Sequence, residues 1–226
     1  MSSSRTVISN SSGDFPVPPT PTNYVSNLSQ VLSLFASDTD TEVVVSDSEY
    51  LNGSLGTGAR PGPEVWKEVV QIGAVKYRGG KQVATFNRYV TPTVHKEMPA
   101  AQWESFTEIT NIKKETLFSD GADFKEVFDA FMTFADGAPI VVIAGDREVY
   151  KWNFRLIGEK SDEKIDKMSW IILRPLLPTE LQTLNSGDLY TKVGLSEAEV
   201  CTGGLTTHNA LFDATSMALF LANFKI

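Results

Sequence analysis

The sequence has one cysteine, two histidines and no long uninterrupted hydrophobic run. Cys201 alone cannot form an internal disulfide, and the chain lacks the clustered cysteines and histidines that hold a structural zinc ion. No apolar segment reaches the roughly 18 residues of a membrane-spanning helix, and residues 1–10 lack the cationic start and apolar core of a signal peptide. We therefore expect an intracellular protein, in the simplest case cytoplasmic, that does not bind membranes.

Positive charge is also scarce, since 28 acidic side chains outnumber 20 basic ones and give a net charge of -8. A protein of this sign does not attract nucleic acid by bulk electrostatics, so a polyanionic partner would need another device, such as metal ions. Hydrophobic residues make up 42% of the 226 residues, which is typical of a globular domain with a buried core. A wholly disordered chain is therefore excluded.

The organisation of the chain changes at about residue 40. Residues 1–22 are rich in Ser, Thr and Pro and predict a flexible tail, and residues 24–35 have the spacing of a short amphipathic helix. We interpret residues 1–40 as an N-terminal extension through which a protein partner could bind, and residues 41–226 as the folded domain.

Hydrophobic periodicity predicts strands first, then alternating helices and strands. The β-branched run at residues 43–45 indicates a buried strand, and a Gly- and Pro-rich loop at residues 52–63 follows it. The other predicted strands are 66–77, 82–90 and 139–144, and the predicted helices are 121–137, 147–157, 186–193 and 208–224. This order predicts an α/β fold in which a mixed central sheet carries helices on both faces.

Asp47 and Glu49 follow the buried run at residues 43–45. Alternation along a strand sends both side chains to one face, roughly 7 Å apart for a rise of about 3.4 Å per residue. Two unpaired carboxylates raise each other's pKa, whereas a divalent cation between them removes the repulsion. The pair predicts a metal site, with solvent-exposed acids at the end of a strand as the alternative.

His208 and Asp213 lie at the start of the last predicted helix. Five residues at 100° each separate them by about 140°, so His208 must lie in the approach to the helix, with Thr206 or Thr207 as N-cap. An imidazole there could take a proton from water. The alternative is a capping histidine beside an unrelated acid. His95, the other histidine, is assigned no role.

A third acidic pair, Asp146 and Glu148, opens the helix predicted at residues 147–157. Asp is typical of an N-cap and Glu of a first turn, so both can serve helix stability alone. A catalytic interpretation requires one of them to point across the end of the sheet toward Asp47 and Glu49. The spacing leaves open which one.

Taken in order, Asp47-x-Glu49, an acid at position 146 or 148 and His208-x4-Asp213 resemble the DEDDh exonucleases, a family with the ribonuclease H-like fold. Residues 68–77 (EVVQIGAVKY) and 106–134 also resemble segments of this family. The resemblance covers about residues 42–224.

The sequence departs from the family at two places. Tyr50 and Leu51 follow the first motif, where the family often has Thr or Gly. In the second motif the family usually has Asp followed by an apolar residue, whereas here Glu148 precedes Val149. This segment is similar to the coronavirus proofreading exonuclease, whose acid is a glutamate. We therefore favour Glu148 as the second-motif acid and Asp146 as the N-cap.

The resemblance implies a metal-dependent 3'-to-5' exonuclease that releases nucleoside monophosphates from single-stranded or frayed RNA or DNA ends. It implies two Mg²⁺ or Mn²⁺ ions and His208 as general base. The implied metal ligands are Asp47, Glu49, Asp213 and Glu148, with Asp146 as the alternative to Glu148. Tyr50 and Trp103 are candidates for stacking on terminal bases.

Two alternatives to this function follow from the departures and the acidic surface. The first is a ribonuclease H-like binding or scaffolding module without turnover. The second is an exonuclease subunit that is active only with a partner, tethered by the N-terminal extension.

Overall fold

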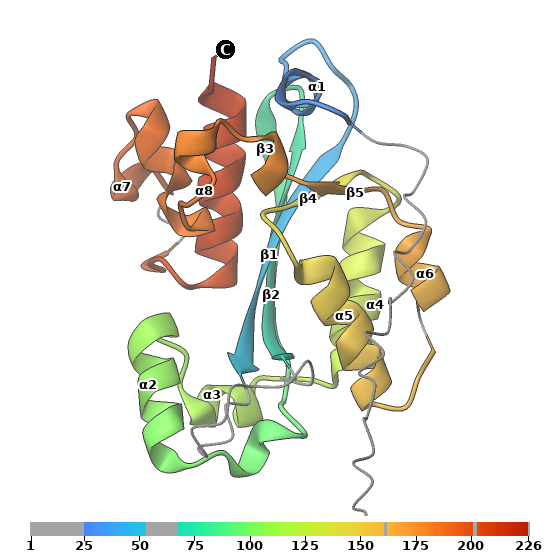
Figure 1. The fold of residues 1–226 in the computed structure, drawn as a ribbon, viewed down its shortest axis with the longest axis vertical. Coiled ribbons are helices and arrows are strands. Elements are labelled where there is room, and N and C mark those ends of the chain that lie inside the picture. The colour runs from blue at the N-terminus through green and yellow to red at the C-terminus, as the bar shows by residue number, and fades with distance from the viewer. Residues whose placement is uncertain (1–24, 53–66, 161, 201–202, 226) are drawn as a thin grey trace, which may run out of the picture.

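The computed structural model describes residues 25–52, 67–160, 162–200 and 203–225 (Figure 1). The tail predicted at residues 1–22, residues 53–63 of the predicted loop and the start of the strand predicted at residue 66 lie outside these ranges.

A five-stranded sheet with strand order β3-β2-β1-β4-β5 forms the centre of the domain. Its strands are β1 (Val43–Asn52), β2 (Lys67–Arg78), β3 (Lys81–Tyr89), β4 (Ile140–Val142) and β5 (Trp170–Ile172). β1, β2 and β3 are antiparallel neighbours, whereas β4 is parallel to both β1 and β5. The predicted α/β fold with a mixed sheet is confirmed, and β5 is a strand that the sequence did not reveal.

Helices cover both faces of this sheet, as Figure 1 shows for α8 on one side and α4 and α5 on the other. The helices are α1 (Leu28–Ser33), α2 (Ala100–Thr110), α3 (Lys114–Ser119), α4 (Phe124–Ala135), α5 (Asp146–Leu156), α6 (Asp162–Asp166), α7 (Glu197–Val200) and α8 (Ala210–Asn223). The 3₁₀ helices are η1 (His95–Glu97), η2 (Arg174–Leu176), η3 (Thr179–Leu181) and η4 (Ser186–Val193). No described helix is both long and apolar enough to cross a bilayer.

The alternation of side chains along β1 divides the core between the two faces. Val43 and Val45 belong to the cluster under α8, whereas Val44 belongs to the cluster under α4 and α5. α1 is shorter than the predicted helix, and its Leu28 and Val31 are buried in the α8-side cluster. The extension that we predicted before residue 40 therefore contributes to the core.

The unequal lengths of β1 and β4 create an open strand edge at the centre of the sheet. β4 has three residues and pairs with β1 only through Val44 and Val45. β1 continues to Asn52, so its edge beyond Val45 has no strand on that side among the described residues. α5 begins at Asp146 beside this edge. Polar side chains of β1 can therefore meet the N-terminus of α5.

Candidate active site

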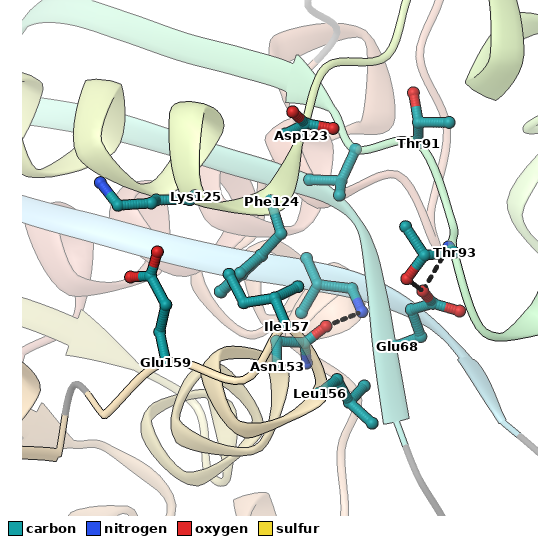
Figure 2. Close-up of a pocket in the computed structure, with 12 residues that line it drawn as sticks. Glu68, Thr91, Thr93, Asp123, Phe124, Lys125, Asn153, Leu156, Ile157 and Glu159 are labelled. Atoms are coloured by element: carbon teal, nitrogen blue, oxygen red, sulfur yellow. Dashed lines mark hydrogen bonds between the residues drawn. The ribbon is translucent and has the colours of Figure 1, made fainter.

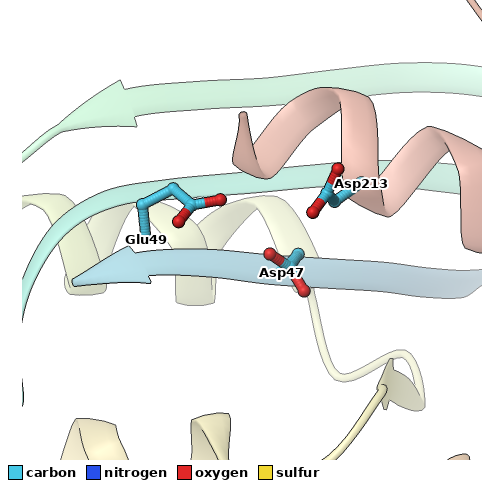
Figure 3. Close-up of side chains that lie close together, drawn as sticks. All are labelled: Asp47, Glu49 and Asp213. Carbon is cyan, nitrogen blue, oxygen red and sulfur yellow. The ribbon is translucent and has the colours of Figure 1, made fainter. Parts of the chain in front are cut away.

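Three carboxylates converge on the α8 side of the sheet. Asp47 and Glu49 project from β1, and Asp213 projects from the first turn of α8 toward them (Figure 3). Each offers one oxygen, and the three oxygens lie within 4.8 Å of one another. Asp47 and Asp213 are buried and Glu49 is half-buried. The two-residue alternation that we inferred from the sequence is the geometry observed.

A glycine on β2 allows α8 to come this close. Gly73 pairs directly with Asp47 across the sheet, and a Cβ at this position would collide with the backbone of Ala210 and Leu211. Beside it, the Gln71 side chain accepts a hydrogen bond from the Ala210 amide at 3.1 Å. The start of α8 is therefore seated on β2, and Asp213 is carried to Asp47.

The start of η4 holds the Asp213 carboxylate from the other side. The Ser186 hydroxyl donates to Asp213 at 3.2 Å, and the hydroxyl of Ser216 on α8 donates to the Ser186 carbonyl at 2.8 Å. A Cβ at Gly187 would collide with the Asp213 carboxylate. Sequence analysis missed Ser186 and Gly187, because they approach the acid only through the packing of η4 on α8.

The structure brings Asp146, and not Glu148, into the site. Asp146 is 6% exposed and accepts a hydrogen bond from the Ser48 hydroxyl at 2.5 Å. The Glu148 side chain is 55% exposed and lies 3.4 Å from Arg147 and 3.8 Å from Lys151, turned toward the surface of α5. The preference for Glu148 therefore does not agree with the geometry.

The N-cap interpretation of Asp146 is also wrong. Gly145 occupies the N-cap position of α5, and Asp146 is the first helical residue. Its side chain is turned to the open edge of β1, where it accepts the hydrogen bond from Ser48. Spacing could not predict this direction, because it depends on where β4 ends.

His208 lies in the approach to α8, as the sequence predicts. Its backbone has a φ of 64°, and its amide donates to Asp213 at 3.2 Å. The N-cap of α8 is Asn209, whose side chain accepts from the Leu211 amide, and not Thr206 or Thr207. The left-handed backbone of His208 turns the chain into the helix and keeps the histidine at the site.

The site is one pocket of about 330 Å³ that His208 lines together with all four acids, Asp47, Glu49, Asp146 and Asp213. Tyr50 lines it as well, whereas Trp103 is 5% exposed within the core cluster under α2. Trp103 is therefore not available to stack on a base.

Burial raises the pKa of these carboxyl groups, and their mutual repulsion adds to the effect. The pKa of Asp47 is well above its usual range because the group is buried and Asp146, Asp213 and Glu49 surround it. Burial and the neighbouring acids raise the pKa of Glu49 to about 9. Burial raises the pKa of Asp213 to about 7 although Ser186 and His208 donate to it. Four such groups together suit a bound cation.

A second pocket, of about 340 Å³, lies between β2, α4 and α5 (Figure 2). Its buried polar groups already bind one another, since Asn153 accepts from the Val69 amide and Glu68 accepts from Thr93. The acidic pocket is therefore the better candidate for a catalytic site.

Comparison with known proteins identifies the family. Residues 40–220 match the sequence profile of the RNase_T family, described as exonuclease. This chain belongs to that exonuclease family. No curated protein sequence matches it.

Solved structures of exonucleases have a similar fold. The nuclease domain of 3'hExo, a DEDDh family member bound to rAMP, has a TM-score of 0.62 and 15% identity over 83% of this chain and 92% of that chain. S. pombe Pop2p, in a form with bound Mg²⁺ and Mn²⁺, has a TM-score of 0.58 and 15% identity over 86% of each chain. Cell-death related nuclease 4 has a TM-score of 0.59 and 16% identity over 81% of this chain and 63% of its own.

These likenesses confirm the ribonuclease H-like fold and the expected exonuclease family. The similarity to a viral proofreading enzyme stays a prediction, and its main support, Glu148, lies outside the pocket.

Proposed function

We propose that this protein is a divalent-metal-dependent 3'-to-5' exonuclease that releases nucleoside monophosphates from single-stranded nucleic acid. The observation that carries the proposal is the convergence of Asp47, Glu49 and Asp213 within 4.8 Å, in a chain of an exonuclease family. Two of the three acids are buried. Burial of carboxylates without a compensating partner costs free energy, which argues against acids that merely lie at the end of a strand.

The donor set suits hard divalent cations such as Mg²⁺ or Mn²⁺, which prefer carboxylate oxygens. Asp47, Glu49 and Asp213 would hold two ions, and Asp146 would complete the set directly or through water. Such ions lower the pKa of an attacking water and stabilise the oxygen that leaves. The charges balance, since four carboxylates carry about -4 and two divalent ions about +4.

His208 is the proposed general base. It lines the pocket with the acids, and the hydrogen bond from its amide to Asp213 fixes its backbone beside a proposed metal ligand. An imidazole in this position accepts the proton of the attacking water and passes it to solvent. Ser186 orients Asp213, so it acts as a positioning residue rather than a catalytic one.

A free nucleic-acid end is the proposed substrate. The pocket of about 330 Å³ has room for a terminal nucleotide rather than a duplex. Among the similar structures, 3'hExo is bound to rAMP, and an E. coli ExoI complex with ssDNA has a TM-score of 0.53 and 14% identity over 79% of this chain and 39% of that chain. Both support a single-stranded RNA or DNA end.

The test is incubation of the protein with 5'-labelled single-stranded RNA and DNA in Mg²⁺, Mn²⁺ or EDTA. We expect a ladder that shortens from the 3' end, that EDTA abolishes and that Asp213→Asn eliminates. Glu163→Gln is the matched control, because its side chain is 84% exposed and paired with Lys167. Immediate release of the 5' label as a mononucleotide, without a ladder of intermediate lengths, would refute the direction.

Absence of cleavage by the folded protein under every metal condition would favour one of the two alternatives. Restoration of cleavage by a partner protein would identify a partner-dependent subunit. Absence of metal binding by calorimetry as well would identify a binding module without turnover.

A further inference from the structure

A basic side chain lines the acidic pocket without forming an ion pair with any of the described acids. Lys67, the first residue of β2, and Arg174 both line the pocket. The Arg174 guanidinium donates to the backbone carbonyls of Gln182 and Leu184, so it holds the chain before η4. Within the described ranges, no carboxylate lies within 4.0 Å of the Lys67 ammonium. Lys67 therefore keeps its charge available.

A neutral partner holds this ammonium in place. It donates to the Tyr50 phenol oxygen at 2.8 Å and lies 4.1 Å from the centre of the Tyr50 ring. Neither contact cancels the charge, because a phenol accepts a hydrogen bond and an aromatic face attracts a cation without being an anion. Tyr50 is also a position at which the sequence departs from the DEDDh pattern. The residue that departs from the family pattern, Tyr50, is therefore the hydrogen-bond partner of Lys67.

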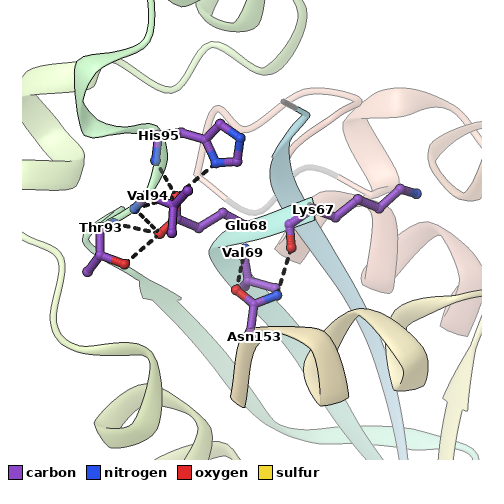
Figure 4. Close-up of polar contacts among 7 residues, drawn as sticks. All are labelled: Lys67, Glu68, Val69, Thr93, Val94, His95 and Asn153. Atoms are coloured by element: carbon purple, nitrogen blue, oxygen red, sulfur yellow. Dashed lines mark hydrogen bonds and ion pairs between the residues drawn. The ribbon is translucent and has the colours of Figure 1, made fainter. Parts of the chain in front are cut away.

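The backbone of Lys67 is fixed to the helix that carries Asp146. The buried Asn153 side chain of α5 donates to the Lys67 carbonyl at 2.8 Å and accepts from the Val69 amide at 2.9 Å. Next to Lys67, Glu68 is bound by residues 93–95 (Figure 4). The Lys67 side chain extends away from these contacts. Two buried anchors, Asn153 and Glu68, therefore fix the backbone from which this side chain projects.

Lys67 also lies close enough to the acids to act on the same ligand. Lys67 lines the same pocket of about 330 Å³ as all four acids, Asp47, Glu49, Asp146 and Asp213. A phosphate at the acidic cluster, or the next one along a strand, would therefore lie near the ammonium.

We propose that Lys67, held by Tyr50, binds a phosphate group of the nucleic-acid strand beside the acidic cluster. The inference rests on the proposed exonuclease function and adds a binding contact to it. A strand carries one negative charge per nucleotide, and a protein of net charge -8 repels it. A lysine that lines the pocket, and that has no carboxylate partner among the described residues, offsets this repulsion locally. A compact ammonium suits phosphate as a point charge.

The test is binding of a short single-stranded oligonucleotide whose 3'-terminal phosphorothioates resist hydrolysis, measured by fluorescence anisotropy in Mg²⁺ at several salt concentrations. In Lys67→Met we expect Kd to rise about tenfold and the slope of log Kd against log salt to fall by about 0.7, the value for one contact to a single strand. Lys67→Arg should restore the slope, because the charge remains. Tyr50→Phe should raise Kd about threefold with the slope unchanged.

Lys167→Met is the matched control, because that lysine is 74% exposed and its partner is Glu163 on α6. It should change neither Kd nor slope. If Lys67→Met binds like the unsubstituted protein while the latter degrades unprotected strands, the phosphate contact is wrong and the proposed function stands. If the folded unsubstituted protein neither binds nor cleaves any strand, both proposals are overturned.

Discussion

Buried carboxylates occur at two places along the β1–β2 strand pair, at Glu68 and at the acidic cluster, and their surroundings differ in kind. Glu68 on β2 accepts hydrogen bonds from the amides of Thr93, Val94 and His95, from the Thr93 hydroxyl and from the His95 ring (Figure 4). Burial alone would raise its pKa, but these donors outweigh burial and lower the pKa to about 2.

The acidic cluster of Asp47, Glu49 and Asp213 has far fewer donors. Burial raises the pKa of each acid, and the other acids raise that of Asp47 and Glu49 further. The comparison teaches that burial alone does not mark a functional acid. A buried carboxylate with many hydrogen-bond donors holds a loop in place. A group of buried carboxylates with few donors is stabilised by a bound cation instead.

The largest expected effect comes from making one acid of the cluster neutral. Asp47→Asn should lower the cleavage rate by roughly a thousandfold, about 4 kcal/mol, because the metal set loses a charged ligand. The same change should raise the Tm of the metal-free protein, because it removes one repelling carboxylate. Cleavage rates and thermal melts in EDTA measure both effects. A fall in both quantities would mean that Asp47 serves structure.

A hundredfold effect should separate the two acids of α5. Asp146→Asn should lower the rate by about a hundredfold, because Asp146 faces the pocket. Glu148→Gln should change the rate by less than about threefold, since its side chain meets solvent and two basic residues. The ratio of the two rates is the measurement. The reverse ranking would restore our sequence-based preference for Glu148.

Substitution of Glu68, the acid with many hydrogen-bond donors, should change the stability of the protein rather than its cleavage rate. Glu68→Gln leaves amide donors with a weaker acceptor, and we expect the free energy of unfolding to fall by about 2–3 kcal/mol. Cleavage per folded molecule should change little at low temperature. Urea unfolding gives the first quantity and active-site-normalised rates the second. A stability loss below about 0.5 kcal/mol would contradict the structural role of Glu68.

The smallest expected effect is on the pH dependence of stability, to which Glu49 and Glu68 contribute with opposite signs. Folding raises the pKa of Glu49 from 4.5 to about 9. The unfolded chain therefore releases this proton at lower pH than the folded protein, and stability falls as pH rises from 4.5 to about 9. Glu68 has its pKa lowered to about 2, so its contribution is present above pH 4.5 and is lost as pH falls toward 2.

In EDTA the Tm should therefore fall by about 5 °C from pH 5.5 to pH 8.5, and Mg²⁺ should remove most of this fall. Melting curves across this range, with and without Mg²⁺, are the measurement. A Tm in EDTA that rises with pH would show that the acids of the cluster are not destabilising when ionised.

The sequence predicted most of the fold and part of the site. Periodicity located β1 to β4, α4, α5 and α8, because their apolar patterns are long or strongly alternating. It did not reveal the three-residue β5, which carries too few residues for a pattern. Asp47 and Glu49 were predictable because strand alternation alone brings them to one face.

The remaining parts of the site depend on contacts between distant segments. Asp146 enters the pocket because β4 ends early, and Ser186 reaches Asp213 because η4 packs on α8. His95 was assigned no role, yet its ring contacts Glu68, which is 27 positions away in the chain. No local pattern contains information of this kind.

The close packing of α8 on Gly73 has a consequence for the order in which the acidic cluster assembles. Asp47 is paired within the β1–β2 hairpin, but Asp213 arrives only with α8, the last helix that the structure describes. Before α8 docks, Asp47 and Glu49 face water and ionise as ordinary acids. The three carboxylates are therefore brought together only when α8 packs on the sheet, and β1 alone does not assemble the acidic cluster.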